Sequence, residues 1–161
     1  MSHASPLKAP KPRIDSRDFL ALMPDVYEAL AALGKAAVTA GIEESLLEIV
    51  KIRASQINGC AYCLQHHLNI AARLQMPQDK LDMVAVWREA PQFSSRERAA
   101  LAWAEALTQI AEGVSDELYS DVRTEFSDKE LAYVSSAIGQ INVWNRLGAA
   151  MQWTPPPRRN G

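Results

Sequence analysis

The sequence has no long apolar run, only two cysteines and no strong excess of charge of either sign. Because a bilayer crossing needs about 20 predominantly apolar residues in a row, no segment is expected to span a membrane. Residues 1–18 also lack an apolar stretch that could serve as the core of a secretory signal peptide. We therefore expect a cytoplasmic protein whose thiols are kept reduced, where cysteines are more often catalytic or metal-binding than structural.

The charge balance argues against a nucleic-acid-binding surface. Seventeen Lys and Arg residues are outnumbered by 19 Asp and Glu residues, which leaves a formal net charge of −2. The basic clusters lie at residues 8–13 and 158–159, in proline-rich ends of the chain. We interpret residues 1–14 and 154–161 as flexible, solvated tails around one domain of residues 15–153, and expect neither a nucleic-acid nor a membrane partner.

Strand-like alternation is scarce, and apolar residues recur instead at helical spacing. Val26, Leu30, Leu33 and Ala37 form one such stripe, while the segment after Gly41 is apolar almost all round and should be central. The pattern predicts an all-α domain of six to eight helices. The expected helical ranges are about 15–22, 24–40, 43–56, 60–74, 79–87, 94–111, a short helix from 115, and 127–150.

Two of these helices carry the same N-terminal signature. Ser94 and Ser127 are each followed three residues later by a glutamate, Glu97 and Glu130, which is the spacing of a capping box. The two serines therefore mark where the helices begin.

The segment EIVKIRASQINGCAYCLQHH, residues 48–67, contains the residues that point to chemistry. An Asn-Gly turn precedes Cys60, so the first cysteine should lie at a helix start, where free backbone N–H groups stabilise a thiolate. At about 100° per residue, Cys60, Cys63 and His67 fall within about 60° on one helix face. An imidazole there can take a thiol proton, and a second thiol three residues away can close a disulfide.

Three other interpretations of the cysteine pair remain open at this point. The cysteines could be small buried apolar residues, or Cys60, Cys63, His66 and His67 could hold zinc. Structural zinc sites usually take their ligand pairs from separate elements, however. A thioredoxin-type site needs strands and βαβ units, which this pattern does not predict. The residues favour a redox-active dithiol on a helical scaffold.

With Glu48 twelve residues before Cys60, this segment resembles the carboxymuconolactone decarboxylase superfamily, specifically its alkyl hydroperoxidase AhpD-like branch. The resemblance covers most of residues 20–150, including the phrases FSSRERAALAWAEALT and INVWNRLGAAM. It implies a compact AhpD-like helical subunit that assembles into trimers or hexamers. It also implies reduction of organic hydroperoxides, without a metal or other cofactor, and re-reduction by an external dithiol such as a lipoyl-bearing protein.

The resemblance also implies roles for individual residues. Cys63 corresponds to the thiol that attacks the peroxide, Cys60 to the resolving thiol, and His67 with Glu48 to a proton relay. One position departs from the family pattern, since Tyr62 stands where the best-studied hydroperoxidases have a histidine. His66 is then a second auxiliary candidate beside Tyr62.

Glu48 also has a purely structural interpretation, as an ion-pair partner of Lys51 or Arg53. Its apolar neighbours predict burial, and burial would raise the pKa of its carboxyl and make it a better proton acceptor. Further along, Asn142, Asn145 and Arg146 interrupt an otherwise apolar helix and need hydrogen-bond partners. We expect them at a subunit contact or at a wall of the active site.

The main hypothesis is thus a thiol-dependent peroxidase that acts on organic hydroperoxides through Cys60 and Cys63 in antioxidant defence. The alternative, motivated by Tyr62, is a thiol–disulfide oxidoreductase or redox sensor without significant peroxidase turnover. A non-enzymatic helical assembly protein with a zinc clip is a third hypothesis.

Overall fold

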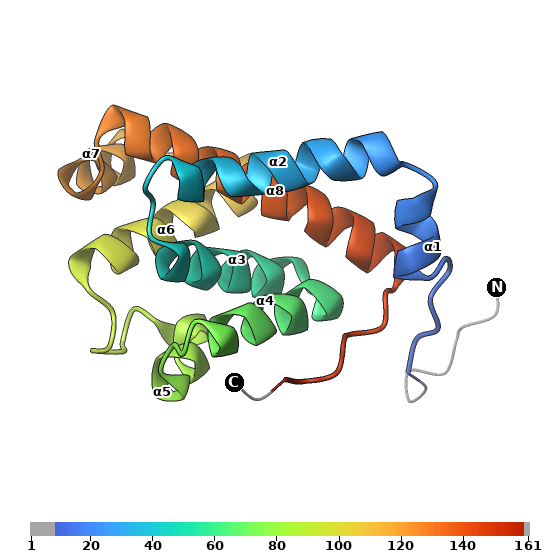
Figure 1. The fold of residues 1–161 in the computed structure, drawn as a ribbon. Helices are drawn as coiled ribbons and strands as arrows, with labels where there is room; N and C mark the ends of the chain where they lie inside the picture. Colours follow the sequence, from blue (N-terminus) through green and yellow to red (C-terminus); the bar gives the residue numbers. More distant parts are fainter. Residues whose placement is uncertain (1–8, 160–161) are drawn as a thin grey trace.

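The computed structural model describes residues 9–159, and within that range every regular element is helical, as Figure 1 shows. This confirms the predicted all-α fold class. Eight α-helices and two short 3₁₀ helices follow one another along the chain: α1 (Ser16–Ala21), α2 (Pro24–Thr39), α3 (Glu44–Asn58), α4 (Ala61–Arg73), α5 (Gln78–Asp82), η1 (Val84–Val86), α6 (Ser95–Thr108), η2 (Ile110–Glu112), α7 (Asp116–Glu125) and α8 (Asp128–Met151). The helix expected over 79–87 is therefore two shorter elements, α5 and η1.

Helix α3 is the centre of the molecule. It contacts α4, α6 and α8 (Figure 1), because its apolar residues surround the whole helix rather than one stripe. Leu47, Ile49, Val50 and Ile52 have no exposed surface. The same helix buries Glu48 and Lys51 among these apolar side chains, so the core of the fold also holds the polar residues of interest.

Local sequence signals fix the helix ends. Both predicted capping boxes are confirmed: Ser94 and Ser127 accept from the backbone N–H of Glu97 and Glu130, whose carboxylates accept in return from the serine N–H groups. Gly59 ends α3 at a positive φ of 66°, a left-handed conformation that glycine adopts without steric cost.

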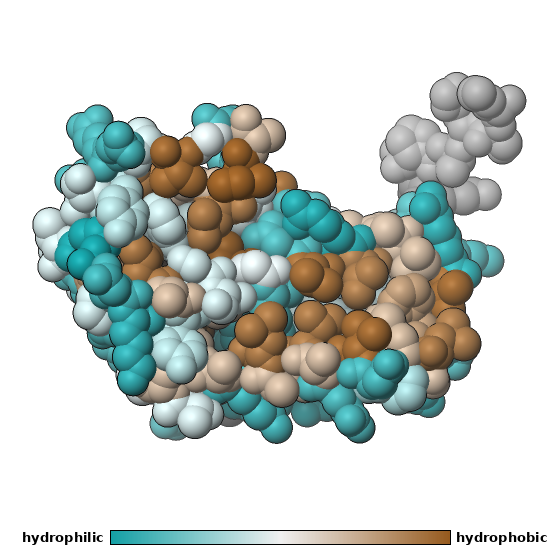
Figure 2. All heavy atoms as spheres, turned by 90° about the horizontal axis from the view of Figure 1, so that it is seen from above, coloured by the Kyte–Doolittle hydropathy of each residue, from teal (hydrophilic) through white to brown (hydrophobic). Residues whose placement is uncertain are grey.

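Part of the apolar stripe of α2 lies at the surface rather than in the core. Ala37 is buried, but Val26 and Leu33 are 43% and 39% exposed, and Val143 of α8 is 40% exposed. Figure 2 shows apolar residues gathered in a band on the face seen from above. The stripe predicted from periodicity exists, but only part of it packs inward.

The described parts of the two ends of the chain contact the helices. The backbone N–H of Arg13 donates to the carbonyl of Met151 at 2.9 Å. The amide group of Asn69 on α4 donates to the carbonyl of Pro157 at 2.9 Å and accepts from the N–H of Arg159 at 3.0 Å. Residues 154–159, expected as a free tail, are thus hydrogen-bonded to α4, while residues 1–8 and 160–161 lie outside the described range. Over residues 9–159, none of the helices has the combined length and apolar character that a membrane crossing requires.

Candidate active site

The two cysteines lie at the junction between α3 and α4. Gly59 reverses the chain direction, and Cys60 follows it as the N-cap residue of α4. Cys60 and Cys63 are joined by a disulfide, with their Cα atoms 5.3 Å apart. The backbone N–H of Cys63 also points at the sulfur of Cys60, with N and Sγ 3.2 Å apart. This places one sulfur at the positive end of the helix dipole, the position that stabilises a thiolate after reduction.

The disulfide is buried against α8. Cys60 and Cys63 are 1% and 4% exposed and pack with Ala54 and Ile141. The Sγ atom of Cys63 lies 3.6 Å from the carbonyl oxygen of Trp144. One turn further along α8, a Cβ atom placed on Gly148 would be only 2.8 Å from the Sγ of Cys60 and 3.3 Å from that of Cys63. The absence of a side chain at Gly148 is what lets the helix backbone approach both sulfurs.

Glu48 of α3 is the centre of a buried polar cluster that also contains Lys51 of α3 and His67 of α4. Its carboxylate accepts from Nδ1 of His67 at 2.7 Å and from Nζ of Lys51 at 3.0 Å. All three residues are at most 8% exposed. Because a carboxylate can only accept, Nδ1 of His67 carries a proton, and Nε2 holds a lone pair that can accept another whenever the ring is neutral.

The pKa of Glu48 differs from the expectation. Burial alone raises the pKa of this carboxyl, as expected, but the hydrogen bond from His67 and the positive charges of His67 and Lys51 lower it by more. The net effect is a pKa below the ordinary value of 4.5. Glu48 is therefore an ionised hydrogen-bond acceptor that orients His67, rather than a carboxyl with a raised proton affinity. Of the two partners suggested for Glu48, Lys51 is the one present, since Arg53 pairs with Glu105 at 2.7 Å.

The structure brings most of the predicted residues into one region but does not connect all of them. Glu48 and His67 are in direct contact, and Cys60 and Cys63 are bonded. Among the described residues, the hydrogen bonds of His67 run to Glu48 and not to a sulfur. A transfer of the Cys63 proton to His67 therefore requires a small movement or an intervening water molecule.

Tyr62 and His66 stack against each other near the disulfide. Their rings are nearly parallel, with an angle of 6° and centroids 6.2 Å apart, and Tyr62 also meets the ring of Trp153 edge-on at 5.3 Å. Partial burial and the neighbouring charge of His67 lower the pKa of His66 to about 4. His66 is thus neutral near pH 7 and can exchange hydrogen bonds without carrying charge.

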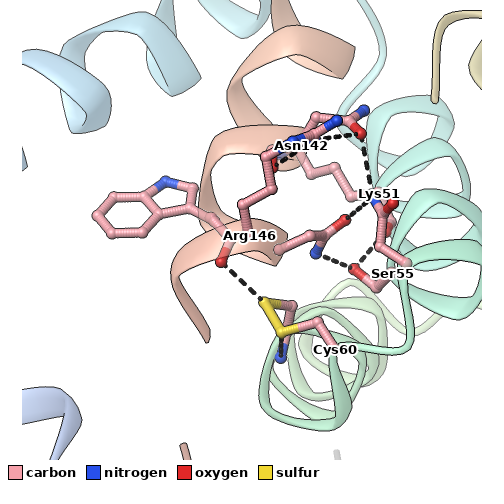
Figure 3. The surroundings of a disulfide bond; sticks show 9 residues. Lys51, Ser55, Cys60, Asn142 and Arg146 are labelled. Atoms are coloured by element: carbon pink, nitrogen blue, oxygen red, sulfur yellow. Dashed lines mark hydrogen bonds between the residues drawn. A yellow bond between two sulfur atoms is a disulfide. The ribbon is translucent and has the colours of Figure 1, made fainter. Parts of the chain in front are cut away.

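A network of amide side chains ties α8 to the end of α3, where the cysteine segment begins. The amide nitrogen of Asn58 donates to both Asn142 and Asn145 at 3.0 Å. Asn145, which is fully buried, donates to the hydroxyl of Ser55 at 3.0 Å. Figure 3 shows Asn142 and Arg146 of α8 across from Lys51 and Ser55 of α3, next to the disulfide. Asn142 and Asn145 of α8 therefore find partners at the C-terminal end of α3, beside the disulfide.

A cavity of about 390 Å³ adjoins this region between α2, α4 and α8. Its walls include His67, Tyr62 and Trp144, so it reaches the proton-accepting imidazole and two of the rings that pack on the disulfide. A second, larger cavity of about 510 Å³ lies beside α4 and α5 and is lined by other residues, among them Asn69 and Arg158. Of these two cavities, the first contacts His67 and Tyr62, although neither cysteine is among its lining residues.

Three of the four residues considered as zinc ligands are bonded to other groups. Cys60 and Cys63 are bonded to each other, and His67 is bonded to Glu48. Across residues 9–159, no group of three or more His, Cys, Asp and Glu side chains has a metal-binding arrangement.

Just over half of the chain matches a known protein family. The model of the carboxymuconolactone decarboxylase family matches residues 24–106, which are more than half of the 161 residues. The chain belongs to this family. The match covers α2, α3 and α4, and hence the cysteine pair, Glu48 and His67.

Similarity to individual proteins extends over more of the chain than the family model does. The uncharacterized protein YdfG of Bacillus subtilis is 32% identical over 131 residues, which are 81% of this chain and 89% of YdfG. The crystal structure of a protein of unknown function from Agrobacterium tumefaciens, a candidate antioxidant defence protein AhpD, is 34% identical with a TM-score of 0.85. The similarity covers 92% of this chain and all of that one, which places this chain in the AhpD-like branch.

The debrominase Bmp8 has the same fold, with a TM-score of 0.77 over 85% of this chain and 74% of its own. Its identity is 24%, so the comparison concerns the fold alone. The fold therefore serves more than one chemistry, and the function of this chain must be argued from its own site.

Several residues of the site had no functional signal in the sequence. Lys51 was expected only as an ion-pair partner, and Gly148 and Trp153 were not expected near the cysteines at all. A glycine within a long helix is the one available hint, because it costs about 1 kcal/mol relative to alanine and often marks a close approach.

Proposed function

We propose that this chain is a thiol-dependent peroxidase that reduces organic hydroperoxides through Cys60 and Cys63. The observation that carries the proposal is the cysteine pair at a helix start, able to close a disulfide, next to the buried Glu48–His67 pair and an open cavity. Membership of the AhpD-like branch supports it. A dithiol of this kind needs no bound redox cofactor, since the two sulfurs supply both electrons.

In the proposed cycle, the thiolate of Cys63 attacks the terminal oxygen of the hydroperoxide ROOH. The O–O bond breaks, the alkoxide takes a proton and leaves as the alcohol ROH, and Cys63 becomes a sulfenic acid. The thiol of Cys60 then attacks that sulfur, forms the disulfide and releases water. An external dithiol, such as a lipoyl group on a partner protein, restores both thiols by exchange.

In this cycle His67 is the group that accepts and returns the proton. Its Nδ1–H donates to Glu48, so Nε2 is free to accept the proton of the Cys63 thiol, directly or through a water molecule, and to return it to the alkoxide. The ionised Glu48 stabilises the imidazolium formed in between, while Lys51 compensates the buried carboxylate when the ring is neutral.

Kinetics of single-cysteine variants test the assignment of roles. Cys63→Ser is expected to abolish consumption of cumene or tert-butyl hydroperoxide, whereas Cys60→Ser should consume one equivalent and stop with a sulfenic acid on Cys63. Dimedone labelling followed by mass spectrometry identifies that sulfenic acid. Unchanged peroxide consumption in Cys63→Ser would refute the mechanism.

A second candidate function rests on Tyr62, which replaces the family's histidine directly before Cys63. If Tyr62 leaves proton transfer to peroxide too slow, the dithiol acts as a thiol–disulfide oxidoreductase or redox sensor. Rapid disulfide exchange with reduced lipoamide, together with negligible hydroperoxide turnover, favours this function. Restoration of peroxide turnover by Tyr62→His would then identify Tyr62 as the cause.

We further propose that the chain forms a homo-oligomer in the cytoplasm, a trimer or hexamer as the family resemblance implies. The exposed apolar residues of α2 and α8, Val26, Leu33 and Val143, support the proposal, because association would remove them from water. Multi-angle light scattering gives the mass in solution, and a monomer at micromolar concentration would contradict it.

A further inference from the structure

The cavity beside the disulfide has a wall that is rich in aromatic rings. Four of its lining residues are aromatic, and they form two edge-to-face pairs: Tyr27 with Trp144 at 6.1 Å, and Tyr62 with Trp153 at 5.3 Å between ring centroids. The cavity volume of about 390 Å³ is at the small end of the range of small-molecule sites. Aromatic rings prefer offset and edge-to-face contacts with one another, so the wall suits a ligand that contains a ring.

The charges around the cavity are of one sign. Lys35 and Lys51 line it, and its wall contains no Asp or Glu side chain. Lys51 is already paired with Glu48 behind the wall. Lys35 lies exposed on α2, without an ion pair or side-chain hydrogen bond among the described residues. The cavity therefore presents one positive charge that no protein carboxylate neutralises.

Two other polar side chains of the wall, Trp153 and Gln140, are buried. Trp153 is 5% exposed, and its indole N–H has no partner among the described residues. The amide nitrogen of Gln140, which is 8% exposed, already donates to the carbonyl oxygen of Leu30 at 3.3 Å. The indole and amide groups carry no charge, so the positive charge of Lys35 is what favours an anionic ligand.

We propose that this cavity selects aromatic ligands that carry a carboxylate, and that the substrates of the dithiol are hydroperoxides of this class. The ring lies against Tyr27 and Trp144, and the carboxylate faces Lys35 at the mouth of the cavity. The inference about substrates rests on the proposed peroxidase function, whereas the ligand class follows from the cavity itself. The reaction stays balanced: one hydroperoxide and two thiols give the alcohol, water and the disulfide.

A matched pair of substrates tests the proposal. Cumene hydroperoxide and its para-carboxylate share the ring and the reacting group and differ in the acid alone; the para-carboxamide controls for size. The kcat/KM of the acid is expected to exceed that of the amide by about 2- to 5-fold, the usual gain from an ion pair open to solvent. Higher salt should reduce the preference, because an exposed charge is screened.

Substitution of Lys35 tests whether this side chain causes the preference for the acid over the amide. Lys35→Gln should bring the ratio of the kcat/KM values for acid and amide close to one. Lys129→Gln removes the same charge from another exposed lysine that does not line this cavity, so it should keep the preference. Equal kcat/KM for acid and amide, or equal effects of the two substitutions, would overturn the proposal and leave the peroxidase function standing.

Binding of unreactive ligands separates this proposal from the peroxidase function. Calorimetry with 4-isopropylbenzoate and 4-isopropylbenzamide should show tighter binding of the acid, and the difference should disappear in Lys35→Gln. If no hydroperoxide oxidises the dithiol, this preference still supports the ligand class while the peroxidase function fails. Equal binding of the two ligands would overturn the ligand class whatever the peroxide assays show.

Discussion

Replacing Gly148 with alanine should disturb the disulfide directly. The added Cβ atom would lie 2.8 Å from the Sγ of Cys60, 3.2 Å from Cε3 of Trp153 and 3.3 Å from the Sγ of Cys63, whereas ordinary van der Waals contact begins at 3.4 Å. Both sulfurs of the disulfide and the ring of Trp153 would have to shift together. Overpacking of a well-packed core typically costs about 1–3 kcal/mol.

Gly139 on the same helix provides a matched control, because a Cβ atom there meets nothing within 4 Å. Gly139→Ala should stabilise the protein by up to about 1 kcal/mol through helix propensity alone. Gly148→Ala gains the same helix propensity, but the steric overlap of its methyl group destabilises the folded state. The two variants should therefore differ by about 1–3 kcal/mol in free energy of unfolding. Urea denaturation of the oxidised proteins measures this difference.

The overlap should matter more with the disulfide closed, since free thiols can rotate away from the new methyl group. Gly148→Ala is therefore expected to be reduced more readily than the wild type in a glutathione redox buffer. Each 1.4 kcal/mol of added strain corresponds to about a tenfold change in that equilibrium. Equal unfolding free energies for the two alanine variants, or an unchanged thiol–disulfide equilibrium, would refute the close approach of α8 to the sulfurs.

Two further predictions concern the buried polar groups. Asn145→Leu should destabilise the protein by about 2–5 kcal/mol in urea denaturation, because Ser55 and Asn58 each lose a buried partner; a loss below about 0.5 kcal/mol would contradict the network. The lowered pKa of Glu48 stabilises the folded state at pH values above the ordinary value of 4.5, and this contribution is lost as pH falls through the lower folded pKa. Glu48→Gln should therefore weaken the loss of stability on acidification below pH 4.5, and an unchanged pH dependence of unfolding would contradict the pairing.

Most of the fold could be predicted because its signals are local. The capping boxes at Ser94 and Ser127, the turn at Gly59 and the helical spacing of apolar residues each act within a few positions of the chain. The outcome for α2 shows the limit of such signals. Periodicity identifies an apolar stripe, but which part of it is buried depends on where α8 packs, so Val26 could not be predicted to be exposed.

The candidate residues that share one helix face could be proposed from the sequence, whereas the contacts made by distant helices could not. Cys60, Cys63 and His67 follow from spacing on α4. The direction of the Glu48 pKa shift could not be predicted in the same way. Burial raises this pKa, whereas contacts with both His67 and Lys51 lower it. The approach of Gly148 to the sulfurs is likewise a property of how α8 packs on α4, across more than 80 residues of sequence.

The most direct test of the central claim is a titration of the fully reduced protein with cumene hydroperoxide, following thiols and product together. The proposed mechanism predicts that two thiols disappear for each cumyl alcohol formed. The protein should lose two hydrogens in mass, and peptide mapping should place the disulfide between Cys60 and Cys63. Alcohol formation without loss of thiols, or both thiols remaining after one equivalent of peroxide, would contradict it.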